Sequence, residues 1–389
     1  MTERLPRPVR ALIGVRVINQ LGAYVMSFLA VLAGPDLASA ALAVFGVAAL
    51  ASRWIGGMLL DRLAPRTVVV LGLASTGAAL LVLALAHGPP QTLGAVALVG
   101  LAFELCEPAT QEALARAAPA GRHGDVYGLL GTSLVAAGAV GGLLAAVLLP
   151  LGARWLAVVD AATCLAAAAV ALAFLPREPV RPPVRDAAWR PSRRLVRLTL
   201  AGTAFAAGYL AVLMYMPFVL LQRGAPAWLP GLVLTGAAVL APLTGRLGRR
   251  ALDRLPHERV LAAGTGALAF AALVLAVGRA VPVTVAAYLA WAVADSVLQG
   301  RWQALIASIA PEAERPRWFA FFGSSWGVAQ PAVPGLAALA GGAMPVAAVA
   351  FLAVPLTLRR PKPDPAPDPG PAPVAAKPAA VPEAVPDPS

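Results

Sequence analysis

The chain has 389 residues, of which 59% are hydrophobic and 13% are charged, and its formal net charge is +12. This apolar excess is more than a water-exposed surface tolerates, so the composition excludes an ordinary soluble globular protein. The basic residues lie in short segments between apolar runs, without interleaved aromatic residues, and we therefore expect no nucleic-acid binding.

A bilayer core about 30 Å thick requires about 20 apolar residues in each spanning helix. The sequence contains twelve apolar runs of roughly this length, separated by charged residues, Pro or Gly. We therefore predict an all-α membrane protein with twelve transmembrane helices. In chain order these helices span residues 11–34, 38–60, 67–87, 93–115, 125–149, 153–175, 196–221, 228–247, 258–278, 282–308, 318–338 and 342–358.

The segments between the predicted helices alternate in charge. If the N-terminus is cytoplasmic, the cytoplasmic segments before the tail hold 21 arginines, whereas the opposite loops hold only Arg154, Arg223 and Arg279. Lys and Arg are concentrated on the cytoplasmic side of membrane proteins. The excess of 29 Arg over two Lys is typical of a GC-rich bacterial genome. We expect a multi-pass protein of the bacterial cytoplasmic (inner) membrane, with both termini in the cytoplasm.

The two halves of the chain repeat one another at a constant shift of 192 residues. Asp61 and Arg62 recur as Asp253 and Arg254, and further pairs follow with the same shift as far as the eleventh predicted helix. A constant shift over this length indicates a duplicated six-helix unit. We predict an N-terminal half at 1–175, a cytoplasmic linker at 176–194, a C-terminal half at 195–360 and a disordered cytoplasmic tail at 361–389.

The loop after the second predicted helix resembles the signature loop of the major facilitator superfamily. It has a glycine, then an Asp-Arg pair and a further basic residue, although Ala64 stands where the family usually has glycine. The resemblance implies two pseudo-symmetric six-helix halves and a gating role for this loop and its repeat. Ordinary topology-setting loop charges are the alternative explanation. The residues concerned are Gly57, Asp61, Arg62, Arg66, Asp253 and Arg254.

The fifth predicted helix contains the glycine-rich segment 137–142. It resembles a motif of the proton-coupled exporters of this family, and in this respect the chain is similar to bacterial twelve-helix drug/proton antiporters. The proline of that motif is missing here. Close packing of small residues between helices explains the glycines equally well, so the sequence leaves the direction of transport open.

Ionisable residues at bilayer depth are costly, so each is expected to face a cavity or a partner. Glu104, Glu107 and Gln111 have a spacing that places them on one face of the fourth predicted helix. A second polar stripe lies at the equivalent position of the other half, in the tenth helix. The resemblance implies that helices one, four, seven and ten line a central cavity. The second stripe comprises Trp291, Asp295, Gln299 and Trp302.

The first predicted helix adds another polar set, in which Arg16 lies at a depth similar to that of Glu107. We therefore predict an ion pair between these two side chains. A low dielectric favours a protonated carboxyl group and an approaching cation favours the charged form, so we hypothesise that Glu104 or Glu107, and Asp295, carry the coupling proton. A static ion pair is the alternative. The cavity or substrate candidates are Arg16, Asn19, Gln20, Tyr24, Gln111, Trp291 and Gln299.

Other polar and aromatic residues are left outside this site. Arg53, Asp160 and Arg301 are expected near helix ends, where long side chains extend to the membrane interface. Packing is the commoner role for the remaining aromatic and soft residues, and surface for an amphipathic ligand is the alternative. These residues are Tyr209, Met214, Tyr215 and Trp326.

Together these features predict a secondary active transporter that exports small amphipathic molecules in exchange for protons by alternating access. Proton-coupled or facilitated uptake is the alternative within transport. A membrane-embedded enzyme would need clustered carboxylates or a histidine site, yet His87, His123 and His257 are scattered. A non-transporting sensor is suggested only by the tail. We expect no catalytic residue, no cofactor and no metal, and a monomer whose partners are the substrate, protons and the lipid bilayer.

Overall fold

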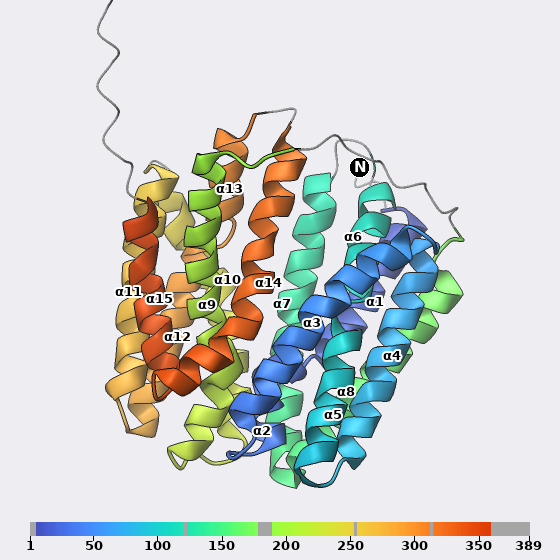
Figure 1. Cartoon of the computed structure of the whole chain (residues 1–389), viewed down its shortest axis with the longest axis horizontal. Coiled ribbons are helices and arrows are strands. Elements are labelled where there is room, and N and C mark those ends of the chain that lie inside the picture. The colour runs from blue at the N-terminus through green and yellow to red at the C-terminus, as the bar shows by residue number, and fades with distance from the viewer. Residues whose placement is uncertain are drawn as a thin grey trace, which may run out of the picture. The chain divides into compact units, whose positions relative to one another are not determined.

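The computed structural model describes residues 5–117, 119, 123–177, 189–252, 255–311 and 314–358, and every regular element in these ranges is helical (Figure 1). The helices group into twelve spans, which confirms the predicted all-α membrane fold. Eight of the described spans are long and apolar enough to cross a membrane, and Leu229–Gly245 and Ala343–Leu358 are shorter apolar helices. The predicted tail at 361–389 and most of the predicted linker lie outside the described residues.

Nine spans run without interruption through the described residues, close to the predicted boundaries. The fifth of the twelve ends in a 3-10 turn, η1 (Leu149–Leu151). The uninterrupted helices are α3 (Ala38–Leu60), α4 (Pro65–Leu85), α7 (His123–Leu148), α8 (Ala153–Phe174), α9 (Arg193–Gln222), α10 (Leu229–Leu252), α11 (His257–Val277), α14 (Arg315–Leu339) and α15 (Ala343–Leu358).

The other three spans are each broken into two helices, so the prediction of continuous helices is wrong there. They are the first, the fourth and the tenth spans, three of the four that were expected to line a cavity. Each break exposes backbone groups that a continuous helix would satisfy internally. The pairs are α1 (Arg7–Leu21) with α2 (Val25–Ala33), α5 (Gly88–Phe103) with α6 (Cys106–Ala117), and α12 (Val281–Leu298) with α13 (Arg301–Ile309).

The break between α5 and α6 has a local cause in Pro108. Proline has no N–H to donate to the carbonyl of Glu104 four residues earlier, and its ring clashes with that carbonyl in a continuous helix. The chain therefore turns at Glu104 and Leu105, and Pro108 lies in the first turn of α6, where proline is tolerated. In the tenth span the turn is made by Gly300, whose φ of +79° is readily adopted only by glycine.

Helices of the N-terminal half approach one another closely where one of them carries glycine. A Cβ atom added to Gly100 of α5 would lie 2.8 Å from the Phe45 carbonyl oxygen of α3, and one added to Gly72 of α4 would lie 2.8 Å from the Cys106 backbone nitrogen of α6. Small residues at helix crossings are the usual means of packing helices in a membrane. Large apolar side chains such as Phe174 and Phe270 remain exposed on the outer surface, as contact with lipid requires.

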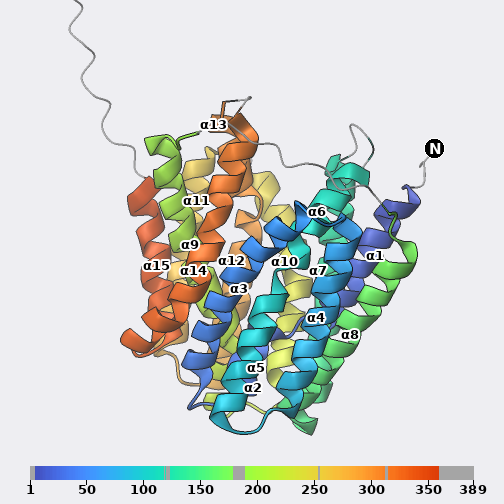
Figure 2. The ribbon, with the colours of Figure 1, turned by 45° about the vertical axis from the view of Figure 1, so that its right-hand side comes forward.

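The main contacts between the two halves join α2 with α9, α3 with α14, and α7 with α10. Figure 2 shows α3 beside α14. Gly46 of α3 lies against the backbone of Pro331 of α14, where an added Cβ would be 2.7 Å from the Pro331 Cα. Added Cβ atoms on Gly142 of α7 and on Gly231 of α10 would collide with Thr235 and with the Ala146 backbone, respectively. These contacts lie toward one end of the bundle, opposite the end at which the N-terminus of the chain lies.

The C-terminal end of the predicted linker is attached to α14. The indole Nε1 atoms of Trp189 and Trp318 both donate to Oε2 of Glu314, over 3.2 and 3.3 Å, and the Trp189 ring packs edge-on against Phe321. Ser192 then caps α9 by accepting a hydrogen bond from the Leu195 N–H. The segment from Trp189 to the start of α9 is therefore held on the C-terminal half.

Candidate functional site

Among the described residues of the N-terminal half, two ion pairs connect different helices, and the first joins α1 to α6. Arg16 Nη1 lies 2.8 Å from Glu107 Oε2, which confirms the predicted pair. Gln111, one turn further along α6, donates from Nε2 to Glu107 Oε1 over 2.9 Å. The Arg16 and Glu107 side chains are 20% and 31% exposed, so this pair is partly accessible rather than sealed in the core.

The second ion pair joins α3 to the break between α5 and α6. Arg53 Nη2 lies 3.2 Å from Glu104 Oε2, and the Glu104 N–H donates to the buried Ser52 hydroxyl over 3.1 Å. The expectation that Arg53 extends to the membrane interface is therefore wrong. Glu104 and Glu107 do not share one helix face, because the break at Pro108 turns Glu104 toward α3 and leaves Glu107 facing α1.

The four charged side chains form one group, which we call the charge cluster: Arg16, Arg53, Glu104 and Glu107. Arg16 acts electrostatically on Glu104 as well as on Glu107. Two positive and two negative charges balance within the cluster. Such a group can change its pairing when one carboxylate gains a proton.

The remaining candidates of the first span lie around the break between α1 and α2. Asn19 accepts a hydrogen bond from the Cys164 thiol of α8 over 3.3 Å, and that sulfur also lies 3.6 Å from Asp160 Oδ1. Asn19, Asp160 and Cys164 line a cavity of about 30 Å³ between α1, α4, α5, α6 and α8. Tyr24 is buried beside Phe28, and Gln20 is half-buried against α7.

Two residues that were expected to extend to the interface are buried instead. Asp160 is 4% exposed and lines the cavity beside Asn19. Arg301 is also 4% exposed and directs Nη1 to within 3.5 Å of His257 Nδ1. Both lie on spans whose ends the sequence predicts closely, so their burial reflects packing against neighbouring helices, which the sequence does not specify.

Asp295 of α12 forms the polar centre of the C-terminal half. It is 7% exposed, and its polar contact is with Gln299, whose Nε2 donates to Oδ2 over 3.5 Å. Trp291 lies one turn before Asp295, but Trp302 falls beyond the break, on α13, and packs on Phe205 and Phe322. The predicted single stripe is therefore divided, and Trp302 belongs to a neighbouring aromatic group.

Aromatic rings from three helices surround the Asp295 region. Tyr209 of α9 has its ring centroid 5.3 Å from that of Trp291 and 5.3 Å from that of Trp326 of α14. Tyr288 of α12 stacks on Trp291 at 5.6 Å. Sequence reasoning missed Tyr288, although its spacing of seven residues before Asp295 places both on one helix face.

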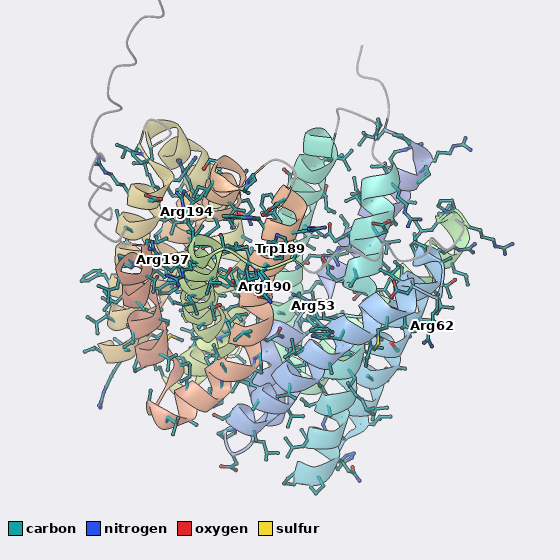
Figure 3. The ribbon with its side chains drawn as sticks, turned by 45° about the horizontal axis from the view of Figure 1, so that its top comes forward. Arg53, Arg62, Trp189, Arg190, Arg194 and Arg197 are labelled. Atoms are coloured by element: carbon teal, nitrogen blue, oxygen red, sulfur yellow. The ribbon has the colours of Figure 1, made fainter. Side chains whose placement is uncertain are left out.

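The loop after α3 lies apart from both polar groups. Gly57 has open space where a side chain would be, and Asp61 caps the C-terminus of α3. Arg66 donates to the Leu172 carbonyl of α8. Figure 3 shows Arg53 on α3 nearer the middle of the bundle, and Arg62 toward its outer side. Asp253 and Arg254, the predicted repeat of this loop, lie outside the described residues.

Within the described part of the chain there is no group of three or more His, Cys, Asp and Glu side chains that could hold a metal ion. A comparison with curated proteins finds no match. Among solved structures, a POT family transporter in complex with 5-aminolevulinic acid is 12% identical with a TM-score of 0.74, over 91% of this chain and 95% of that one. A D-xylose-proton symporter is 13% identical with a TM-score of 0.68, and the match covers 90% of this chain and 95% of the symporter.

A nucleoside transporter is also similar, with 12% identity, a TM-score of 0.70, and coverage of 90% of this chain and 98% of its own. At these identities the likeness establishes the fold. The sequence model of the Major Facilitator Superfamily matches residues 12–252, which is more than half of the chain. The chain therefore belongs to the Major Facilitator Superfamily.

Proposed function

We propose that the protein is a secondary active transporter of the bacterial cytoplasmic membrane that exchanges protons for small amphipathic molecules by alternating access. The observation that carries this proposal is the charge cluster, in which two arginines and two glutamates pair within membrane-spanning helices. Charges at this depth are costly unless they face a cavity or serve a functional exchange. Family membership and the transporter fold of the similar structures support the same conclusion.

In this proposal Glu104 and Glu107 carry the coupling proton. Each carboxylate is bonded to an arginine, so a proton that binds to one of them removes the charge that holds its arginine. Arg16 is attracted to both glutamates. When Glu107 gains a proton and becomes neutral, the attraction of Arg16 to Glu104 exceeds its attraction to Glu107. This change in pairing would alter the contacts between α1, α3 and α6, and it would thereby link proton binding to movement of the helices.

Alternating access is supported by the position of the contacts between the halves. The close contacts at Gly46, Gly142 and Gly231 lie toward the ends remote from the N-terminus. Gly57, near the other end of α3, has open space around it. Because the arginine-rich loops place the N-terminal end in the cytoplasm, this arrangement corresponds to a state closed at the outer end.

Export is the proposed direction, and uptake of a small solute is its alternative. The glycines of segment 137–142 have a packing role: Gly141 lies against the Leu21 carbonyl of α1, and Gly142 lies against α10. Their resemblance to an exporter motif therefore adds little, and the aromatic surroundings of Asp295 support an amphipathic ligand rather than a direction of transport. Counterflow measurements distinguish the two directions.

The test uses the purified full chain in proteoliposomes with an imposed pH gradient of either sign. Movement of cationic, neutral and anionic amphipathic dyes is followed with and without an uncoupler. We expect movement of at least one dye against the proton flow, and loss of its pH dependence in Glu104→Gln and Glu107→Gln. Glu112→Gln, which removes an exposed charge on α6 that pairs with Arg116, serves as the control. Transport with unchanged pH dependence in both glutamate variants would discard the coupling role.

A further inference from the structure

The intramembrane acids of the two halves have different surroundings. In the N-terminal half, Glu104 and Glu107 each contact an arginine. In the C-terminal half, the described residues place no basic side chain within ion-pair distance of Asp295, whose polar contact is the neutral amide of Gln299. A carboxylate at this depth without an opposite charge favours the approach of a cation from outside the protein.

The walls around Asp295 are aromatic. Tyr288, Trp291 and Asp295 lie on one face of α12 at spacings of three and four residues. Tyr209 of α9 bridges Trp291 to Trp326 of α14, with centroid separations of 5.3 Å on both sides. Asp295 follows Trp291 by one helical turn, so its carboxylate lies on the helix face that carries these rings.

The side chains of this group differ in exposure. Tyr209 and Trp326 are half-buried, whereas Trp291 and Asp295 are buried behind them. The Trp291 Nε1–H is buried without a hydrogen-bond partner, so this part of the site has an unused donor as well as aromatic faces.

We infer that Asp295, Tyr209, Trp291 and Trp326 form a binding site for an organic monocation with an apolar body. The negative faces of aromatic rings attract a cation, and the carboxylate adds a full opposite charge that no described arginine competes for. An anionic ligand would be repelled by both. This inference rests on the proposed transport function, because it names the class of substrate that the C-terminal half would accept.

The binding test uses tetraphenylphosphonium and the neutral triphenylphosphine oxide, which share a triphenylphosphorus body and differ in charge. Equilibrium dialysis of the purified full chain in detergent gives the dissociation constant for each, after subtraction of binding to empty micelles. We expect the cation to bind at least tenfold more tightly than the oxide. Equal affinities of the two probes would overturn the inference.

The variants test which groups make the difference. Asp295→Asn is expected to abolish the preference for the cation, whereas Asp295→Glu is expected to retain part of it. Tyr209→Leu and Trp326→Leu are each expected to raise the dissociation constant of the cation by roughly 2- to 30-fold, the range of a cation–π contact. Glu112→Gln removes a charge remote from the site and is expected to bind as the wild type does. A folded Asp295→Asn protein that keeps the full preference contradicts the inference.

Transport assays separate this inference from the proposed function. If gradient-driven movement occurs with neutral or anionic dyes and tetraphenylphosphonium does not bind, the cation site is wrong and transport stands. If tetraphenylphosphonium binds with the expected dependence on Asp295 but no dye moves with a proton gradient, the site stands and coupled transport is wrong.

Discussion

Each glutamate of the charge cluster is bonded to an arginine on a different helix. Arg16 joins α1 to Glu107 on α6, and Arg53 joins α3 to Glu104 at the end of α5. Removing one member leaves a charge without its partner in a partly water-excluded site, and this costs more than the original bond contributed. The effect of replacing one member of a pair therefore depends on whether the other member is still present.

The first prediction concerns this mutual dependence. Glu107→Gln is expected to lower the free energy of unfolding by about 2 kcal/mol, because Arg16 loses a charge-assisted hydrogen bond. The exchange variant Arg16→Glu with Glu107→Arg is expected to recover most of that loss. It restores an ion pair of reversed polarity between the two positions, whose charged groups lie 2.8 Å apart in the wild type. Thermal unfolding in detergent measures both. A swap that is no more stable than the single variant would show that the pair contributes little.

At the level of the helix, Pro108 determines where Glu104 points. Without the break, Glu104 and Glu107 would lie three residues apart on one continuous helix and face the same neighbour. With the break, Glu104 is presented to Ser52 and Arg53 of α3. The proline thus controls the composition of the charge cluster although its own side chain is apolar.

The second prediction follows from this role. Pro108→Ala supplies the missing N–H, so α5 and α6 are expected to join and Glu104 to rotate away from Arg53. We expect proton-coupled transport to fall by roughly tenfold or more, as for loss of a positioned group worth about 1.4 kcal/mol. Pro355→Ala, within α15 and away from the cluster, is the control. Full transport by Pro108→Ala would refute the link between the break and coupling.

The sequence predicted the number and order of the spans well, because apolar length and loop charge are properties of the chain that do not depend on its neighbours. It also paired Arg16 with Glu107, since their depths in two adjacent spans follow from counting. It missed the Arg53–Glu104 pair, because periodicity assumes a continuous helix and Pro108 interrupts it. The burial of Asp160 and the ring contacts of Tyr209 depend on helix packing, which one sequence does not specify.

For the whole molecule, the glycines Gly46, Gly142 and Gly231, which pack against the other half, lie toward one end of the bundle. Gly231, at the end of α10 remote from the arginine-rich loops, lies so close to α7 that an added Cβ would collide with the Ala146 backbone. The third prediction is that Gly231→Val opens this contact and shifts the population toward states accessible from outside. Labelling of a cysteine placed near Thr235 measures the shift. Gly236→Val is the control, because its Cβ would meet only the Leu289 side chain at 3.6 Å.

The second group of glycines lies near the arginine-rich end. Gly131 of α7 and Gly323 of α14 occupy equivalent positions at the shift of 192 residues, and added Cβ atoms would meet nothing within 4 Å in this conformation. Glycine is costly in a helix interior unless close packing requires it. We therefore expect these positions to form the close contacts of the alternative state, in which the arginine-rich end is closed.

The fourth prediction tests that expectation. Gly131→Leu and Gly323→Leu introduce no clash in the conformation described here, so the thermal stability is expected to match that of the wild type or exceed it. The added side chains would oppose closure of the arginine-rich end, and overpacking of about 1 to 3 kcal/mol corresponds to slowing of transport by roughly 5- to 150-fold. Gly94→Leu, at a glycine of α5 that also has open space but lies near the opposite end, is expected to leave the rate unchanged. Equal transport rates in all three variants would mean that the same added volume has the same effect at either end of the bundle. The open glycines at the arginine-rich end would then have no part in closure.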